Sequence, residues 1–454
     1  MNNKHVIVIG AGFAGLTAAR ELQTAGIEYH LVEARDRIGG RAWTDDRLGR
    51  PLELGATWVH WHQPHIWAEI TRYKQDIVAS PVVDRAYWLA DGELKSGTEA
   101  EMDAKLARPM EKIFEGSREF FPEPHKPLLV LDEDFGASQE LKDAFLAADA
   151  ASVLDPLEDG DFTQEEKDLC NAYWSAGYIG NPATGSSLMA KQWAALCDHR
   201  LSLVDEQTLR YKLVNGMRGI YNNIARDLTG EIRLNTQVAK IEHHADSVTV
   251  TYANGTSETA DAVIVTVPVG ALSHIEFSPA LPEGSQKTIE KKWNSTGFKA
   301  WIKIKGHHNI FGYAPQPNVV SVLRSEYFED DDTTICVAFG ADHTKIDLTS
   351  VEDAQKAIDQ WRPDLEVVGV TGHDWVADDY SGQAWATLRQ CQFTDGWHHF
   401  REPSTALHFA GADWANGWRG VVVDGAIETG ISTAREVIDK LRAAGSNADL
   451  TQVA

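Results

Sequence analysis

The sequence predicts an α/β fold, in which a Rossmann-like dinucleotide-binding domain built from discontinuous segments is joined to an α+β domain with a mixed sheet and helices. A short apolar run from His5 to Ile9 leads into a glycine-rich turn that opens a helix, which is typical of a β-α-β unit. Residues 66–209 have mostly helical patterns, and strand-like runs return after them. At 454 residues, the chain is long enough for two or three domains.

The first unit is defined by two strands, one helix and the turn between them. The strand at 5–9 is followed by a helix over 13–25, which Gly26 ends, and by a second strand at 29–32. The turn Gly10-Ala-Gly12-Phe-Ala-Gly15 fits G-x-G-x-x-G, whose first two glycines let the backbone approach a pyrophosphate at the helix N-terminus. Glu33 ends the second strand, where a carboxylate can bind ribose hydroxyls.

The remaining elements divide into two groups along the chain. Strands are expected at 231–234, 238–243, 247–252, 262–267, 299–305, 336–339 and 407–410, and a closing helix at 422–441. The strands at 299–305 and 336–339 suggest a second, more exposed sheet, and 446–454 a loose tail. We predict a dinucleotide-binding domain from residues 1–78, 205–280 and 386–454, and a substrate-binding domain from 79–204 and 281–385.

Charge and cysteine content exclude several classes of function. Acidic residues outnumber basic ones by 67 to 42, so neither nucleic acid nor an anionic membrane is an expected partner. No apolar run approaches the roughly 20 residues of a spanning helix, and the N-terminus lacks the pattern of a signal peptide, so a cytoplasmic enzyme is expected. Cys170, Cys197, Cys336 and Cys391 form no C-x-x-C pair and are expected to be reduced core residues.

The segment after Glu33 distinguishes between dinucleotides. Arg35, Arg37 and Arg41 bring three guanidinium groups close to the ribose-binding position, and Gly39-Gly40 adds a second glycine pair. Guanidinium groups can neutralise a pyrophosphate that the first turn leaves partly exposed. An NAD-binding domain does not need this extension.

The stretch from Val8 to Thr44 resembles the start of the flavin monoamine oxidase family, which includes monoamine oxidases, polyamine oxidases and related bacterial amine oxidases. Further segments match in family order and span nearly the whole chain: 53–60, 214–217, 235–238, 262–268, 409–413 and 424–430. The resemblance implies FAD as the cofactor. It assigns to FAD the residues Gly10, Gly12, Ala14, Gly15, Glu33, Ala34, Arg35, Gly40, Arg41, Gly55, Ala56, Thr57, Trp58, Val238, Gly411, Asp413, Val422 and Val423.

Lys299 and Trp385 are the two residues that the resemblance makes catalytic. Strand alternation places Lys299 with Trp301, Lys303 and Lys305 on a face that would by itself be interpreted as solvated. The family, however, has a lysine here that is linked through a water to flavin N5 and takes part in the reaction with oxygen. Relatives with covalent flavin have a cysteine just before one aromatic wall. Here Ala384 precedes Trp385, so noncovalent FAD is expected.

The substrate pocket is expected to contain His60, Trp385, Trp418 and Val422. Val422 falls where the family has its second aromatic wall, so the two-ring cage is expected to be incomplete. His60, His62 and His65 form an H-x-H-x-x-H pattern, but there is no cysteine or further ligand nearby and no metal is expected. His60 is instead interpreted as a substrate contact, because polyamine oxidases have a histidine at the matching place.

The resemblance implies an FAD-dependent amine oxidase. A neutral primary or secondary amine, aryl-alkyl or cyclic and of nicotine type, would pass a hydride from its α-carbon to flavin N5. The imine would be hydrolysed to an aldehyde or ketone, and O2 would reoxidise the flavin to give H2O2. The alternatives left open are an amine dehydrogenase that uses an electron carrier, a polyamine oxidase, and an L-amino-acid oxidase with Arg389 as the carboxylate partner. A homodimer is also left open.

Overall fold

The computed structural model describes residues 4–401, 406–420 and 423–451, with the backbone alone for 445–451. A five-stranded parallel sheet forms its base, in the order β10-β2-β1-β14-β21. Its strands are β10 (Glu231–Arg233), β2 (Glu28–Val32), β1 (His5–Ile9), β14 (Ala262–Val265) and β21 (Leu407–Phe409). The expected apolar strands are therefore confirmed. They come from three distant parts of the chain and pair in register, with Ile7 between His30 and Val263.

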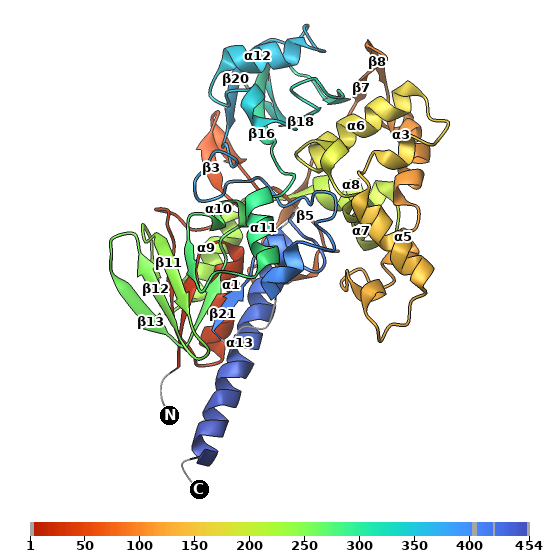
Figure 1. Cartoon of the computed structure of the whole chain (residues 1–454). Coiled ribbons are helices and arrows are strands. Elements are labelled where there is room, and N and C mark those ends of the chain that lie inside the picture. Colours follow the sequence, from red (N-terminus) through yellow and green to blue (C-terminus); the bar gives the residue numbers. More distant parts are fainter. Residues whose placement is uncertain (1–3, 402–405, 421–422, 452–454) are drawn as a thin grey trace.

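Both faces of the parallel sheet are covered, which explains why its strands are continuous apolar runs. Val6 and Val8 pack with α1 (Phe13–Thr24), α9 (Arg218–Asp227) and the long α13 (Val423–Thr451). Ile7 and Ile9 point to the other face and belong to the largest core cluster. On that side lies the four-stranded sheet β13-β12-β11-β15 (Figure 1). Its strands are β11 (Val238–His243), β12 (Val248–Tyr252), β13 (Ser257–Ala260) and β15 (Glu276–Ser278).

The second large sheet has seven strands in the order β20-β16-β19-β18-β17-β7-β8. They are β20 (Val367–Gly372), β16 (Phe298–Lys305), β19 (Thr333–Gly340), β18 (Val322–Glu329), β17 (Ile310–Tyr313), β7 (Arg85–Ala90) and β8 (Glu93–Gly97). The expectation of a more exposed sheet is wrong, because every residue of β19 is buried. One face packs against α12 (Val351–Asp359) and the other contributes to the main core.

A helical layer lies beside this sheet and forms the right-hand lobe of the molecule (Figure 1). It contains α3 (Glu99–Phe114), α4 (Ser117–Phe120), α5 (Gln139–Ala150), α6 (Gln164–Gly177), α7 (Ser187–Leu196) and α8 (Leu201–Leu209). The expectation of a mostly helical segment at 66–209 is thus confirmed in its main part. It missed β7 and β8, which join the seven-stranded sheet as a hairpin at its edge.

Short elements connect these layers. They are β3 (Thr44–Arg47), β4 (Arg50–Glu53), β5 (Trp58–Val59), α2 (Pro64–Arg72), β6 (Ile77–Ala79), β9 (Tyr211–Leu213), α10 (Val269–Leu272) and α11 (Glu283–Lys291). Single 3-10 turns occur at Leu129–Leu131, Asp155–Leu157, Pro182–Thr184, His343–Lys345, Trp397–Arg401 and Ala412–Trp414.

Three further expectations need correction or comment. The closing helix does not end near residue 441: α13 continues to Thr451, so most of the expected loose tail is helical. Cys391 is exposed, whereas the other three cysteines are buried as expected. No helix within the described residues is long and apolar enough to cross a membrane.

Candidate functional site

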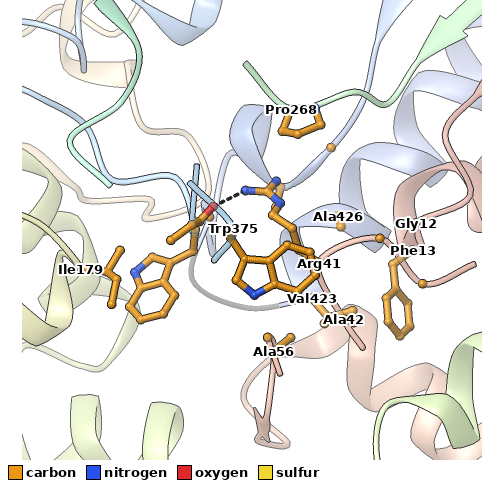
Figure 2. A pocket seen from close by; sticks show the side chains of 18 of the residues that line it. Gly12, Phe13, Arg41, Ala42, Ala56, Ile179, Pro268, Trp375, Val423 and Ala426 are labelled. Atoms are coloured by element: carbon orange, nitrogen blue, oxygen red, sulfur yellow. Dashed lines mark hydrogen bonds between the residues drawn. The ribbon is translucent and has the colours of Figure 1, made fainter. Parts of the chain in front are cut away.

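A cavity of about 310 Å³ lies between the parallel sheet, the seven-stranded sheet and the helical layer. One end is lined by the turn after β1 and by the segment after β2, and the other by apolar side chains of α6, α7, α8, β17 and β19. Figure 2 shows this arrangement, with Gly12 and Phe13 on one side of the view and Ile179 on the opposite side. The cavity thus joins a glycine-rich end to an aromatic end.

The glycine turn has the shape that a dinucleotide phosphate needs. Gly10 has a φ of +104°, and a Cβ at Gly15 would overlap the carbonyl oxygen of Gly10, so α1 can pack closely on β1 only with glycine there. A Cβ at Gly12 would meet no atom nearer than 3.8 Å, because this residue opens onto the cavity. The backbone amides at the start of α1 therefore face open space that suits an anion.

Glu33 is held in the position of a ribose-binding carboxylate. Its side chain is only 6% exposed, and its two oxygens accept hydrogen bonds from the backbone amides of Ala11 and Arg35, at 2.8 and 2.9 Å. Arg35 in turn forms an ion pair with Asp378 and lies over the ring of Tyr380. These bonds fix the turn and the carboxylate relative to each other at the rim of the cavity.

Arg41 is anchored beside the cavity by Asp413. Its guanidinium donates to Asp413 at 2.7 Å and to the carbonyl oxygen of Ala384 at 2.6 Å, the bond that is dashed in Figure 2. The other carboxylate oxygen of Asp413 accepts from the side chains of Trp293 and Gln383, at 2.9 and 2.8 Å. Asp413 is 1% exposed and does not line the cavity, so it acts by positioning Arg41.

Lys299 lies at the junction of the two ends. Its Nζ atom donates to the carbonyl oxygens of Glu53 and Gly55, both at 2.8 Å, and to the hydroxyl of Thr57. The side chain is 5% exposed, so the solvated-face interpretation of this strand fails at Lys299. Only the far end of β16 follows the pattern, where Lys303 is half-buried and Lys305 exposed.

The environment of Lys299 changes its proton affinity. Burial lowers the pKa of Lys299 to about 7, and the carboxylates of Glu53 and Glu326 oppose that shift. Glu53 is itself buried, which raises its pKa, while Met217 and Thr44 donate hydrogen bonds to it. A lysine whose pKa lies near neutrality can hold or release a proton during a reaction.

The aromatic end of the cavity has several walls that no motif predicts. Trp385 does line it, and its indole nitrogen donates to the carbonyl oxygen of Gly177 at 3.1 Å. Its ring meets that of Phe339 edge-on, with centroids 5.9 Å apart. Unpredicted side chains that line this end include Tyr173, Ile179, Trp193, Val204, Asp205, Thr208, Leu209, Phe311, Tyr313, Val322 and Phe339.

Part of this lining had a signal in the sequence. Val204, Asp205, Thr208 and Leu209 follow the spacing i, i+1, i+4, i+5, which places them on one face of α8. Asp205 and Thr208 are the polar members of that face. The aromatic residues from β17 and β19 had no such signal, because their pattern is the same as that of any core strand.

Most of the residues assigned from the sequence meet at this cavity. Those that line it are Gly10, Gly12, Ala14, Glu33, Ala34, Arg35, Gly40, Arg41, Gly55, Ala56, Thr57, Trp58, Val238, Lys299, Trp385, Gly411 and Val423. Gly15 and Asp413 stand behind the lining and support it. Val422 lies outside the described residues.

Two expected pocket residues lie elsewhere. His60 is 2% exposed and does not line the cavity, because its ring stacks on Trp61 and its Nδ1 accepts from the backbone amide of His62. Trp418 is 1% exposed and is also absent from the lining, since the loop before Gly420 turns its ring into the main core. Both positions differ from the expectation of a substrate contact.

Comparisons with known proteins agree with this geometry. Residues 13–438 match the sequence model of a family described as flavin-containing amine oxidoreductases. The chain is 31% identical over 450 residues to a pseudooxynicotine dehydrogenase of a Pseudomonas species, a match covering 97% of this chain and 88% of the relative. It is 28% identical over 441 residues to (S)-6-hydroxynicotine oxidase of Paenarthrobacter nicotinovorans, covering 93% and 96%.

The fold also occurs among solved structures. A structure of putrescine oxidase bound to putrescine superposes with a TM-score of 0.80 at 22% identity, over 96% of this chain and 99% of that one. Cyclohexylamine oxidase from Brevibacterium oxydans gives a TM-score of 0.77 at 18% identity. At these identities the likeness concerns the fold alone.

Proposed function

This chain belongs to the family of flavin-containing amine oxidoreductases, and on that premise we propose that it oxidises a primary or secondary amine of aryl-alkyl or cyclic type, with O2 as the electron acceptor. The observation that carries the proposal is the position of Lys299, which lies between the glycine-rich end and the aromatic end of one cavity. Lys299 lines this cavity together with Gly55 at the first end and Trp385 at the second.

FAD is the cofactor of this family, and the residues at the glycine-rich end fit it. The amides at the start of α1 and the Arg41 guanidinium would hold its pyrophosphate, and Glu33 a ribose. When bound, the flavin supplies two-electron oxidation of the substrate C–H bond. We propose noncovalent binding, because all four cysteines are described and none lines the cavity. Ala384 lines it directly before Trp385, where covalent relatives have cysteine.

The aromatic end would bind the amine in its neutral form. Walls made of Trp385, Phe339 and Ile179 cannot solvate an ammonium group, so they lower the pKa of the amine that reacts. Water is also displaced from the reacting carbon. The named relatives that act on pseudooxynicotine and hydroxynicotine support an aryl-substituted or cyclic amine.

Lys299 would assist the oxygen reaction through the charge at Nζ. A protonated Nζ attracts the negative charge that develops on O2 as it is reduced. Overall, a primary amine RCH2NH2, O2 and H2O give RCHO, NH3 and H2O2, which balances atoms and electrons. Two electrons leave the C–N unit and reduce O2, and the oxygen of the aldehyde comes from water.

A second candidate is an amine dehydrogenase, favoured by the printed name of the Pseudomonas relative. Such an enzyme passes its electrons to a carrier and reacts slowly with O2. The same cavity serves both functions, since only the acceptor differs. Lys299 would then have little influence on turnover with the carrier.

The test of the proposed function is the visible spectrum of the purified protein. We expect flavin bands that bleach when an amine panel is added anaerobically and that return in air with one equivalent of H2O2. Slow return in air, with fast return on adding an electron-carrier protein or dye, would favour the dehydrogenase. A flavin that no amine bleaches would contradict the proposed function.

A further inference from the structure

Asp205 is a carboxylate in an otherwise aromatic and aliphatic part of the substrate cavity. It lies on α8, one turn before Thr208, and both residues line the space beside Tyr173 and Tyr313. Along this part of the described lining, the other side chains are uncharged. A carboxylate in such surroundings loses much of its hydration, which costs free energy unless a donor or a cation replaces the water.

The protein provides a hydrogen-bond donor to only one of the two oxygens of this carboxylate. The hydroxyl of Tyr173 donates to one oxygen, Oδ1, at 2.9 Å. Among the described residues no lysine, arginine or histidine forms an ion pair with Asp205. The charge of Arg324 lowers the pKa of Asp205, but the guanidinium of Arg324 donates to the carbonyl oxygen of Leu209 and not to Asp205. In the part of the chain that the structure describes, no hydrogen bond reaches the second carboxylate oxygen, and Asp205 lines the cavity.

The surroundings of Asp205 add negative charge rather than compensating for it. Burial raises the pKa of Asp205, the acidic residues Asp103 and Glu99 of α3 raise it further, and Tyr173 and Arg324 oppose the rise. The net result is a pKa of about 7. A cation that entered the cavity would meet the carboxylate of Asp205, whereas Asp103 and Glu99 do not line the cavity.

We propose that Asp205 binds the second, protonated nitrogen of a diamine substrate, whose other nitrogen is neutral and is oxidised beside Lys299 in the same cavity. This inference rests on the proposed function and narrows it to amines with two basic nitrogens. The charge-assisted hydrogen bond to Asp205 fixes which end of the substrate approaches the flavin. Specificity arises because a monoamine leaves the carboxylate without a partner.

The test uses the holoenzyme and two amines of the same size, 1,5-diaminopentane and hexan-1-amine, in which a methyl group replaces the second ammonium. We expect the wild-type protein to have the higher kcat/KM for the diamine. Asp205→Asn should lower kcat/KM for the diamine about tenfold or more, since a charged hydrogen bond is lost, and leave that for hexan-1-amine within about twofold. Glu206→Gln is the matched control, because Glu206 is the next residue on α8 and does not line the cavity.

A binding measurement separates this inference from the proposed function. In 2,5-dimethylhexane-2,5-diamine the carbons next to nitrogen carry no hydrogen, so it cannot be oxidised, and its Kd can be measured by calorimetry. Asp205→Asn should weaken that Kd about tenfold. If no amine bleaches the flavin but this Kd still depends on Asp205, the proposed function fails and the site stands. If hexan-1-amine is oxidised as well as the diamine, the site fails and the function stands.

A pH series on the wild-type protein provides a test that needs no variant. The ratio of kcat/KM for the diamine over hexan-1-amine cancels the titration of the nitrogen that reacts. We expect this ratio to fall as the pH decreases through about 7, because Asp205 becomes protonated and loses its charge. A ratio that is constant between pH 6 and 8.5, or equal to one throughout, would overturn the inference.

Discussion

The Nζ atom of Lys299 lies 2.8 Å from the carbonyl oxygen of Gly55, and this hydrogen bond joins the seven-stranded sheet to the segment that lines the glycine-rich end of the cavity. A second bond supports it, because the indole nitrogen of Trp301 donates to the carbonyl oxygen of Glu53, also at 2.8 Å. Both donors come from β16. The relative position of the two ends of the cavity is therefore fixed by side chains of one strand.

Lys299→Met should slow reoxidation of the reduced enzyme by O2 about 100-fold, because the charge and the proton at Nζ are lost. Anaerobic bleaching by substrate should change less than about threefold. Stopped-flow measurement of the two half-reactions separates these effects. Equal losses in both would show that Lys299 serves to hold the active site together instead.

The oxygen reaction should depend on pH through the same residue. Lys299 has a lowered pKa of about 7, and the groups that face it are Glu53, Glu326 and Lys212. Its charge is present below that pH and is lost above it, so the rate constant with O2 should fall between pH 6 and 8.5. Lys299→Met should show no such step, and an unchanged step in the variant would contradict the assignment.

Trp385→Ala should lower kcat/KM at least about tenfold while the flavin content stays normal. The substrate pocket loses one of its walls in this variant and becomes open to water. Trp385→Phe keeps an aromatic face but removes the donor to Gly177, so it should recover most of the activity. The measurement is steady-state oxidation of an amine panel, with the absorbance ratio of flavin to protein as control. Unchanged kinetics with every amine would contradict the position of the pocket.

Asp413→Asn should reduce both stability and FAD retention. The carboxylate accepts from Arg41, Trp293 and Gln383, and an amide nitrogen in place of one oxygen would face donors. We expect the free energy of unfolding to fall by about 3 kcal/mol. Glu366→Gln is the control, since Glu366 pairs with Lys305, their side chains are 61% and 63% exposed, and its loss should change stability little. Urea unfolding followed by fluorescence measures both.

Gly12 and Gly15 of the turn should have different roles, the first in binding FAD and the second in the stability of the fold. Gly12→Ala should fold with normal stability but bind FAD more weakly, because its Cβ enters the open space that the phosphate needs. Gly15→Ala should lower the melting temperature even without FAD, since its Cβ overlaps the carbonyl oxygen of Gly10. Thermal unfolding of apoprotein and an FAD titration distinguish the two. Equal behaviour of both variants would contradict the distinction.

The parallel sheet and the glycine-rich end could be predicted because local sequence determines them. Each local signal there is compatible with one structural role. These signals are the apolar run at 5–9, the spacing of Gly10, Gly12 and Gly15, and the position of Glu33. The buried position of Lys299 was harder to predict, because polar and apolar residues alternate along β16 as in a strand with one solvated face. Tertiary packing buries the first half of that face and leaves the second half exposed.

The substrate end could not be predicted for a different physical reason. Asp205, Phe311 and Phe339 lie far apart in the sequence and meet only when α8 packs beside β17 and β19. An aromatic residue on a buried strand has the same pattern whether it lines a cavity or fills the core. His60 illustrates the opposite error. Its position in the sequence suggested a substrate contact, but in the structure its ring packs against Trp61 and the residue does not line the cavity.

The order of strands in the parallel sheet also affects how the protein can be made. β14 pairs on one side with β1, through Ala262 and Val6, and on the other with β21, through Val263 and Leu407, so both partners lie far from it in the sequence. A nascent polypeptide must therefore hold β14 with one apolar edge open until β21 has been synthesised. Closing such distant pairs is slow, and exposed strand edges favour aggregation. We expect overproduction at low temperature, or with abundant chaperones, to increase the yield of folded protein.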